Sequence, residues 1–350
     1  MGRYREADLS LLKVGPVLER PTKVSVEDFA RPLDPAAARA VLETLPRQLA
    51  GEALREVVAR TARARRDGRP GIAMCGGHVV KVGVSPCLIA LMERGVITHL
   101  AMNGAAAIHD VEIARMGRTS EDVEARLHQG TFGMVDETGD FMNAAMLEGS
   151  RRGEGLGESW GRSLEESGSP HGALSLLATA WRLGVPATVH VAIGTDTVHQ
   201  HPRCDGAALG ETSLRDFRIL AGTLAESRGA VVLNFGSAVL MPEVFLKALS
   251  VARNLGADLS GLTTVNFDQI QHYRPHMNVV ERPTRAPGAR GYALTGHHEI
   301  LVPLFAGAVL AALEGDAEGA PARAGARPGA GGAAGTSGGT RGGSSGAHRA

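Results

Sequence analysis

Short apolar runs recur along the chain and alternate with longer segments of helical periodicity. The apolar runs lie at 71–75, 97–102, 187–193, 230–235 and 262–267. Their continuous apolar character is typical of strands buried on both faces of a parallel sheet. The helical patterns lie at 36–65, 85–94, 105–116, 120–128, 172–183, 213–227, 242–255 and 299–313. This alternation predicts an α/β fold, with a doubly wound, mostly parallel sheet that has helices on both faces.

The patterns divide the chain into three parts. We expect an N-terminal helical region at 1–66, a Rossmann-like domain at 67–313 and a disordered tail rich in glycine and alanine at 314–350. The last part has almost no large apolar residues, so burial cannot offset the entropy lost on ordering it. Thr119, followed by acidic residues, is expected to cap the helix at 120–128.

Composition narrows the class of protein. The 350 residues include 37 basic and 37 acidic ones, and a formal net charge of zero gives no reason to expect nucleic acid or a membrane as partner. Three cysteines are too few and too scattered for a disulfide framework. The start lacks the apolar core of a signal peptide, and the apolar run at 300–313 is too short to span a bilayer. We therefore expect a soluble, cytoplasmic protein.

Small and polar residues follow the predicted strands. They are Gly76, Gly77, His78, Asn103, Gly104, Thr195, Asp196, Asn234, Gly236 and Asn266. The carboxyl ends of parallel strands meet at one edge of a sheet, where open α/β sheets bind ligands. Glycine lets the backbone approach a phosphate, although it serves tight turns equally well. Neither the G-x-x-x-x-G-K-[ST] loop nor the G-x-G-x-x-G spacing is present, which disfavours P-loop enzymes and ordinary Rossmann dehydrogenases.

The order of short motifs resembles the deoxyhypusine synthase family between about residues 70 and 313. The motifs are GHVVKVG at 77–83, GTD at 194–196, SLRDFRIL at 213–220, ARNLGAD at 252–258, TTVNFD at 263–268 and TGHHEILVPL at 295–304. The resemblance implies a deoxyhypusine synthase-like fold, NAD as cofactor, a small amine or polyamine substrate and a homotetramer. Met241 stands where the family has its catalytic lysine. Methionine cannot attack an imine.

The resemblance implies a transferase-type enzyme that transiently oxidises an amine to an imine, followed by transfer or hydrolysis. Two alternatives stay open at the level of sequence. One is a non-catalytic nucleotide-sensing protein that lost the lysine. The other is a metal-dependent hydrolase built on a histidine cluster, for which His199, His201 and Cys204 are the candidate ligands. No second half of a known zinc pattern accompanies them, so we predict no metal site.

Lys81 is one of four lysines and is flanked by apolar residues. The resemblance places the Lys81 ammonium against the pyrophosphate of the cofactor, where it would act as a point charge. The alternative is that the Lys81 amine forms an imine with the substrate. His297 and His298 are candidates for a general base, or else they line the pocket. The resemblance places Asp196 or Asp205 near the cofactor or the substrate amine, and Asp110 is a candidate for binding ribose hydroxyls. For each of these carboxylates a helix N-cap is the competing interpretation.

Overall fold

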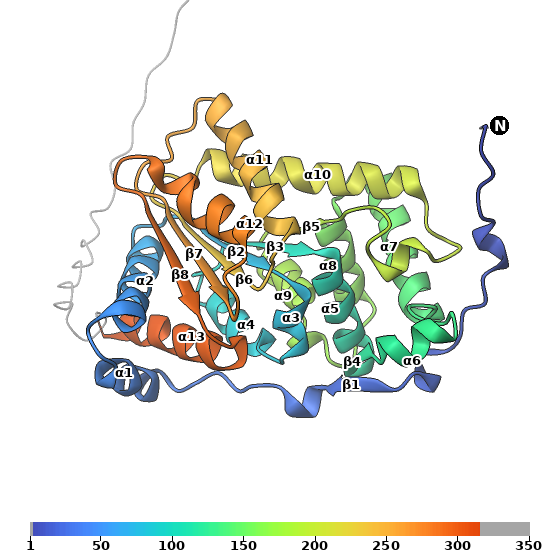
Figure 1. The fold of residues 1–350 in the computed structure, drawn as a ribbon, viewed down its shortest axis with the longest axis horizontal. Helices are drawn as coiled ribbons and strands as arrows, with labels where there is room; N and C mark the ends of the chain where they lie inside the picture. The colour runs from blue at the N-terminus through green and yellow to red at the C-terminus, as the bar shows by residue number, and fades with distance from the viewer. Residues whose placement is uncertain (1–2, 316–350) are drawn as a thin grey trace, which may run out of the picture.

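A six-stranded parallel sheet organises the chain, and the order of its strands reverses half-way along the sequence (Figure 1). The computed structural model describes residues 3–315. The strands follow the order β5–β3–β2–β6–β7–β8, which reads 3-2-1-4-5-6 when these strands are counted along the chain. They are β2 (Gly71–Cys75), β3 (His99–Asn103), β5 (Ala187–His190), β6 (Val231–Phe235), β7 (Thr263–Asp268) and β8 (Arg290–Thr295). In sheets of this order, ligands bind at the carboxyl ends of the strands where the order reverses, here between β2 and β6.

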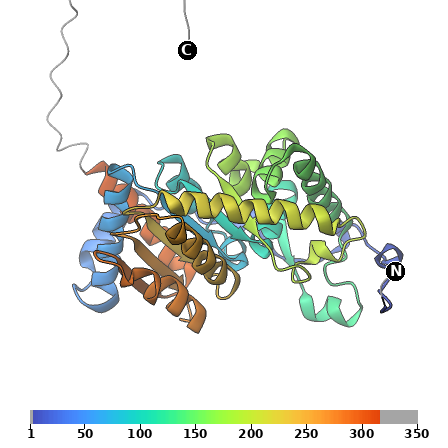
Figure 2. The same ribbon diagram turned by 90° about the horizontal axis from the view of Figure 1, so that it is seen from above.

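Helices cover both faces of the sheet, as the sequence predicts. They are α1 (Pro35–Thr44), α2 (Leu49–Arg66), α3 (Gly77–Lys81), α4 (Ser85–Glu93), α5 (Gly104–Met116), α6 (Val123–His128), α7 (Asp136–Arg152), α8 (Leu156–Glu166), α9 (Leu176–Leu183), α10 (Gly206–Ala225), α11 (Leu240–Asn254), α12 (Tyr273–Pro275) and α13 (His298–Glu314). On one face Met74 packs with Phe245 of α11, and on the other Cys75 packs in the cluster that contains Phe305 of α13. Figure 2 shows α10, the long yellow helix, running from the sheet to α7 and α8.

Alternate residues of the inner strands point to these two faces, and both sets are mostly apolar because both faces are covered; the buried Asn234 and Asn266 are exceptions. The side chains of β2 and β6 are buried along their whole length. Parallel pairing places Met74 beside Asn234, and Cys75 beside Phe235. The carboxyl ends of β2 and β6 are therefore level with each other, and the residues that follow them meet at one edge.

A second, two-stranded sheet joins the N-terminal segment to the loop after α5. Strand β1 (Thr22–Ser25) pairs antiparallel with β4 (Arg118–Glu121). The expected helix start at Thr119 is therefore wrong: Thr119 lies in β4, and the side chain of Asp122 caps the shorter helix α6. In Figure 1 the blue N-terminal segment runs beneath the sheet and reaches β4.

Several element boundaries differ from the prediction. The helical stretch at 36–65 is two helices, α1 and α2, and α10 starts at Gly206 rather than at 213. The sequence pattern predicts no strand or helix where β8, α7 and α8 are found. Most of the tail predicted at 314–350 lies outside the described residues. Within residues 3–315, every helix is too short or too polar to cross a lipid bilayer.

Candidate functional site

The glycines at the carboxyl edge bring the ends of neighbouring strands into contact. A Cβ on Gly76 would overlap the carbonyl oxygen of Gly236, so the turn after β2 lies directly against the turn after β6. A Cβ on Gly77 would stand 3.3 Å from Cδ2 of His109, which lies on α5. The ends of β2, β3 and β6 therefore converge. At Gly76 the absence of a side chain serves this close approach of two turns, which is the structural alternative considered above.

A cavity of about 200 Å³ lies at this edge, between α3, α5 and the loop that follows β5. Its polar lining includes Arg20, Lys81, His109, Glu112, Ser120 and Asp196. A larger hollow of about 900 Å³ lies at the opposite edge, where the strands begin, and is lined by Arg60, Arg63, Arg69, Arg228 and Arg290. We place the candidate site in the smaller cavity for two reasons. Both basic and acidic side chains line it, and it lies at the edge where doubly wound sheets bind ligands.

Lys81 and His109 form the basic side of the cavity. Among residues 3–315 no carboxylate lies within ion-pair distance of Lys81. Burial, assisted by the charges of Lys81 and Arg20, lowers the pKa of His109 to about 3. His109 is therefore neutral near pH 7, and its Nδ1 lies 2.7 Å from Oγ1 of Thr119. The cationic group available to a ligand on this side is the Lys81 ammonium.

Asp196 forms the acidic side. Burial raises the pKa of its carboxyl to about 6. His199 holds this carboxylate: Nδ1 of His199 accepts a hydrogen bond of 3.1 Å from the backbone N–H of Gly194, which places the ring proton on Nε2, 3.7 Å from Oδ2 of Asp196. Oδ2 of Asp196 is buried and has no hydrogen-bond partner among the described residues. Apart from the His199 ring at 3.7 Å this oxygen has no partner in the described chain, so it can accept a hydrogen bond from a cationic ligand.

A buried charge network supports the floor of the cavity. Arg20, from the N-terminal segment, donates a 2.7 Å hydrogen bond to Glu112, and both side chains are almost fully buried. The other oxygen of Glu112 accepts a hydrogen bond of 2.5 Å from Thr119 in β4. Next in β4, Ser120 has a backbone φ of 67°, a left-handed conformation that costs a serine energy. Strain of this kind concentrates at functional sites, and here it lies in the cavity wall.

His298 lies at the carboxyl ends of β6 and β7, against Gly236 and Phe267. Its Nε2 donates a hydrogen bond of 2.9 Å to the carbonyl oxygen of Phe267, so Nδ1 carries the free lone pair. Nδ1 is buried and has no partner among the described residues. The ring of His298 meets the edge of His78 at 5.5 Å between centroids, and a Cβ on Gly236 would stand 2.8 Å from its Cε1. Burial, followed by the charge of His298, lowers the pKa of His78.

The structure gathers part of the predicted set at this edge. The predicted residues whose atoms line the cavity or touch the glycine turns are Gly76, Gly77, His78, Lys81, Gly104, Thr195, Asp196, Gly236 and His298. Asn103 is also at the edge, where its side chain caps α5. Asn234 and Asn266 lie one step inside the sheet, joined by a 2.7 Å hydrogen bond on the face covered by α11.

Other predicted residues serve elsewhere. Asp110 is fully buried two turns into α5 and accepts hydrogen bonds from Ser175 and from the backbone N–H groups that begin α9. Asp205 caps α10 through the N–H groups of residues 207 and 208. His297 precedes α13 with an exposed side chain, next to Glu299. For Asp110 and Asp205 the capping interpretation accounts for every contact that their carboxylates make in the described chain.

The proposed trio of metal ligands is separated. His199 turns toward Asp196, whereas the Nε2 of His201 faces two aspartates of α7. Cys204 lies two residues before α10. Its sulfur is not among the atoms of Asp136, Asp140 and His201 that lie close enough together to share a metal ion. The three residues therefore do not share one site.

Some residues of the cavity were missed by sequence reasoning. The helix that starts at Gly104 places Ala105, Ile108, His109 and Glu112 on one face, and all four line the cavity. That spacing of three and four residues is visible in the sequence and could have identified His109. No sequence signal identifies Arg20, because it reaches the cavity only through the β1–β4 pairing.

Comparison with known proteins gives structural neighbours only. No family model and no curated protein matches the sequence. ArgZ, an arginine dihydrolase from cyanobacteria, is 16% identical, with a TM-score of 0.44 over 73% of this chain and 32% of its own. A LOR/SDH protein from Methanococcus maripaludis S2 is 15% identical, with a TM-score of 0.44 over 83% and 73%. AgrE in complex with ornithine and NAD+ is 15% identical, with a TM-score of 0.46 over 83% and 35%. The chain spans about a third of the length of ArgZ and AgrE.

These comparisons correct the assignment to the deoxyhypusine synthase family, which is wrong. The structural neighbours are ArgZ, AgrE and a LOR/SDH protein, and no deoxyhypusine synthase model matches the sequence. The motifs behind the assignment are turns of glycine and short polar residues at the ends of parallel strands, which many doubly wound sheets require. The transferase activity and the homotetramer that this resemblance implied are therefore without support. The likeness to the neighbours concerns the arrangement of strands and helices.

Proposed function

We propose that this chain is an enzyme that binds a nicotinamide dinucleotide at the crevice between β2 and β6 and acts on a small amine or amino acid in the adjoining cavity. The observation that carries the proposal is the pairing of charges in the cavity. Asp196 supplies a buried, unpaired carboxylate oxygen, and Lys81 supplies a cation without a carboxylate partner in the described chain. An amino acid carries both complementary groups, whereas an amine carries the ammonium alone and leaves Lys81 for a cofactor phosphate; about 200 Å³ suits either molecule.

The strand order reverses at this edge, which supports a dinucleotide site there. His298 adds a buried Nδ1 lone pair with no partner in residues 3–315. When bound, the nicotinamide supplies a hydride acceptor for the carbon that bears the amine.

In this proposal the chain's own residues bind and orient the substrate. Asp196 holds the ammonium group, and Lys81 holds a substrate carboxylate or a cofactor phosphate. His298 is placed to take a proton at Nδ1, because the Phe267 carbonyl fixes its tautomer through Nε2. The neutral His109 contributes a hydrogen bond rather than a charge.

The first test is binding of NAD+ to the purified full chain by isothermal titration calorimetry, with NADP+ in a parallel titration. The expected result is saturable binding of one dinucleotide per chain. Ornithine, arginine, putrescine and spermidine are then added singly with NAD+, and NADH absorbance is followed. A tritium-transfer assay accompanies it, because a hydride that is returned within the site leaves no net NADH.

Lys81→Met should weaken binding of NAD+ or of the amine at least tenfold, since the cavity loses its free cation. Lys247→Met is the matched control, because Lys247 is exposed and paired with Glu243 on α11. Equal losses in both variants, or no NAD+ binding by the wild-type chain, would refute the proposed site. Binding of NAD+ without hydride transfer from any amine would refute the enzymatic part and favour a nucleotide sensor.

A further inference from the structure

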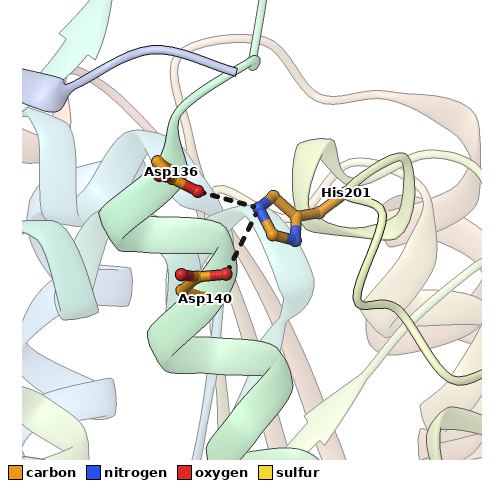
Figure 3. A group of neighbouring side chains, drawn as sticks. All are labelled: Asp136, Asp140 and His201. Carbon is orange, nitrogen blue, oxygen red and sulfur yellow. Dashed lines mark ion pairs between the residues drawn. The ribbon is translucent and has the colours of Figure 1, made fainter. Parts of the chain in front are cut away.

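A histidine ring lies between two carboxylates at the start of α7, outside the cavity described above. Nε2 of His201 is 3.6 Å from Oδ1 of Asp136 and 3.6 Å from Oδ1 of Asp140. The two aspartates are four residues apart and therefore share one face of the helix. Figure 3 shows the Nε2 atom directed between them. Only 6% of the His201 surface is exposed, and its Nε2 has no hydrogen-bond partner in the described chain.

The helix is shaped to receive this ring. Gly139 lies between the two aspartates in sequence, and a Cβ there would overlap Cδ2 of His201. Alanine is favoured over glycine inside a helix by about 1 kcal/mol, so glycine at this position has a packing cause. The imidazole packs directly on the helix backbone, and this contact directs Nε2 toward the carboxylates.

The spacing of the three atoms suits a shared cation better than direct hydrogen bonds. A separation of 3.6 Å is too long for a hydrogen bond. Ligands that bind a metal ion at about 2.0–2.2 Å in tetrahedral geometry lie roughly 3.4 Å from one another. All three candidate ligand atoms lie within 4.8 Å of each other. The geometry is that of ligands arranged around a common centre.

We propose that Asp136, Asp140 and His201 bind one divalent transition-metal ion, Zn²⁺ or Mn²⁺, with water in the remaining positions. One imidazole and two carboxylates form a borderline donor set that suits these ions better than Ca²⁺, which prefers oxygen ligands alone. The proposal is independent of the proposed dinucleotide and amine sites, since it uses none of their residues.

Two contacts must change when the ion binds. Nδ1 of His201 accepts a long, 3.3 Å hydrogen bond from the N–H of Arg203, and a metal on Nε2 requires a proton on Nδ1. The exposed Arg203 side chain is 2.9 Å from Oδ1 of Asp140 and must move away. Both contacts come from one residue of a surface turn, so the rearrangement is local.

The site would fasten the loop between β5 and α10 to α7. This loop carries Asp196 and His199, and Asn143 of α7 already donates a 3.1 Å hydrogen bond to the Val198 carbonyl within it. A metal ion at His201 adds a second link a few residues further on. The ion would therefore stabilise the loop that forms the acidic wall of the cavity.

The test is calorimetric titration of the full chain, without a histidine tag and after EDTA treatment, with ZnCl₂ and separately with MnCl₂. The expected result is one saturable site. Changing even the outer partners of metal ligands costs about 10–100-fold in affinity. Asp136→Asn, Asp140→Asn and Gly139→Ala should therefore each weaken binding at least about tenfold. Glu148→Gln, an exposed acid of α7 paired with Arg151, is the control and should bind as the wild type does.

A second measurement needs no variant. Co²⁺ bound to the wild-type chain should give visible ligand-field bands, and Zn²⁺ should remove them by competition at one equivalent. Zn²⁺ should also raise the Tm of the wild type and of Glu148→Gln, and raise that of Asp140→Asn by less. Absence of saturable binding for both ions, or equal affinity in wild type and the double variant Asp136→Asn/Asp140→Asn, would overturn the proposal.

Discussion

The carboxylate of Asp196 lies over Gly104, the first residue of α5, and occupies the space that a Cβ on Gly104 would take. The loop after β5 is thereby seated on the beginning of the helix after β3. The start of a helix favours a negative charge, whereas burial raises the pKa of this carboxyl to about 6. Gly104 is thus the residue that allows the acidic wall of the cavity to form.

Replacing Gly104 by alanine should displace the Asp196 loop. The added Cβ overlaps the carboxylate, and overpacking of this kind costs about 1–3 kcal/mol in the free energy of unfolding. Gly210→Ala is the control: this glycine of α10 has open space around its Cβ position, so alanine should stabilise the chain by about 0.5–1 kcal/mol. Urea denaturation of the three proteins measures both effects. Stabilisation by Gly104→Ala would contradict the contact.

Asp196 should make stability depend on pH in a defined direction. Its pKa is about 6 in the folded chain, above its ordinary value of 3.8. Between these values the folded state binds more protons than the unfolded state, so its contribution to stability falls as the pH rises from about 4 to about 6. Asp196→Asn removes this dependence. Relative to the variant, the wild type should lose on the order of 2–3 kcal/mol between pH 4 and pH 7. Denaturation series at several pH values give the difference, and a constant difference would disprove the shift.

Arg20 should contribute far more to stability than its neighbour Lys23. Arg20→Met leaves the buried Glu112 without its cation, and breaking a buried pair costs about 3–5 kcal/mol. Lys23 pairs with Asp122 at the surface, so Lys23→Met should cost less than about 1 kcal/mol. Chemical denaturation compares the two. Similar, small losses in both would mean that the N-terminal segment does not dock as described.

His298 and His297 provide a matched pair of adjacent histidines. His298→Ala removes one of the two hydrogen bonds to the Phe267 carbonyl, which keeps the one from the Gly236 N–H, and the loss of a typical hydrogen bond costs about 0.5–1.5 kcal/mol. His297 has an exposed side chain, so His297→Ala should change the free energy of unfolding by less than about 0.5 kcal/mol. If the enzymatic proposal is right, hydride transfer falls only in the His298 variant. Thermal and urea denaturation, followed by the tritium-transfer assay, separate the structural effect from the catalytic one.

The sheet was predictable where burial on both faces forces an uninterrupted apolar run. Strand β2 matches its predicted range, and β6 and β7 differ from theirs by one residue. Strand β8 at the sheet edge escaped notice because all its residues except Leu294 are exposed or half-buried, and a short mixed segment has no distinctive pattern. Helices α7 and α8 escaped for a related reason: glycine and polar residues interrupt their apolar faces.

The candidate site was predictable as far as it depends on strand ends. Gly77, Asn103 and Asp196 follow strands, and parallel pairing alone brings them to one edge. The carboxylates of Asp205 and Asp110 accept hydrogen bonds from the backbone N–H groups at the start of a helix. For an aspartate near a helix, the sequence alone does not distinguish such capping from ligand binding. The strained Ser120 and the distant Arg20 depend on tertiary contacts that no local pattern encodes.

The pair of Arg20 and Glu112 spans 92 residues of sequence. During translation, at about 5–20 residues per second, the arginine leaves the ribosome several seconds before its partner. Until then it is a solvated cation on an undocked arm. The cavity wall that Arg20 and Glu112 form can therefore close only after the first two strands of the central sheet have been made.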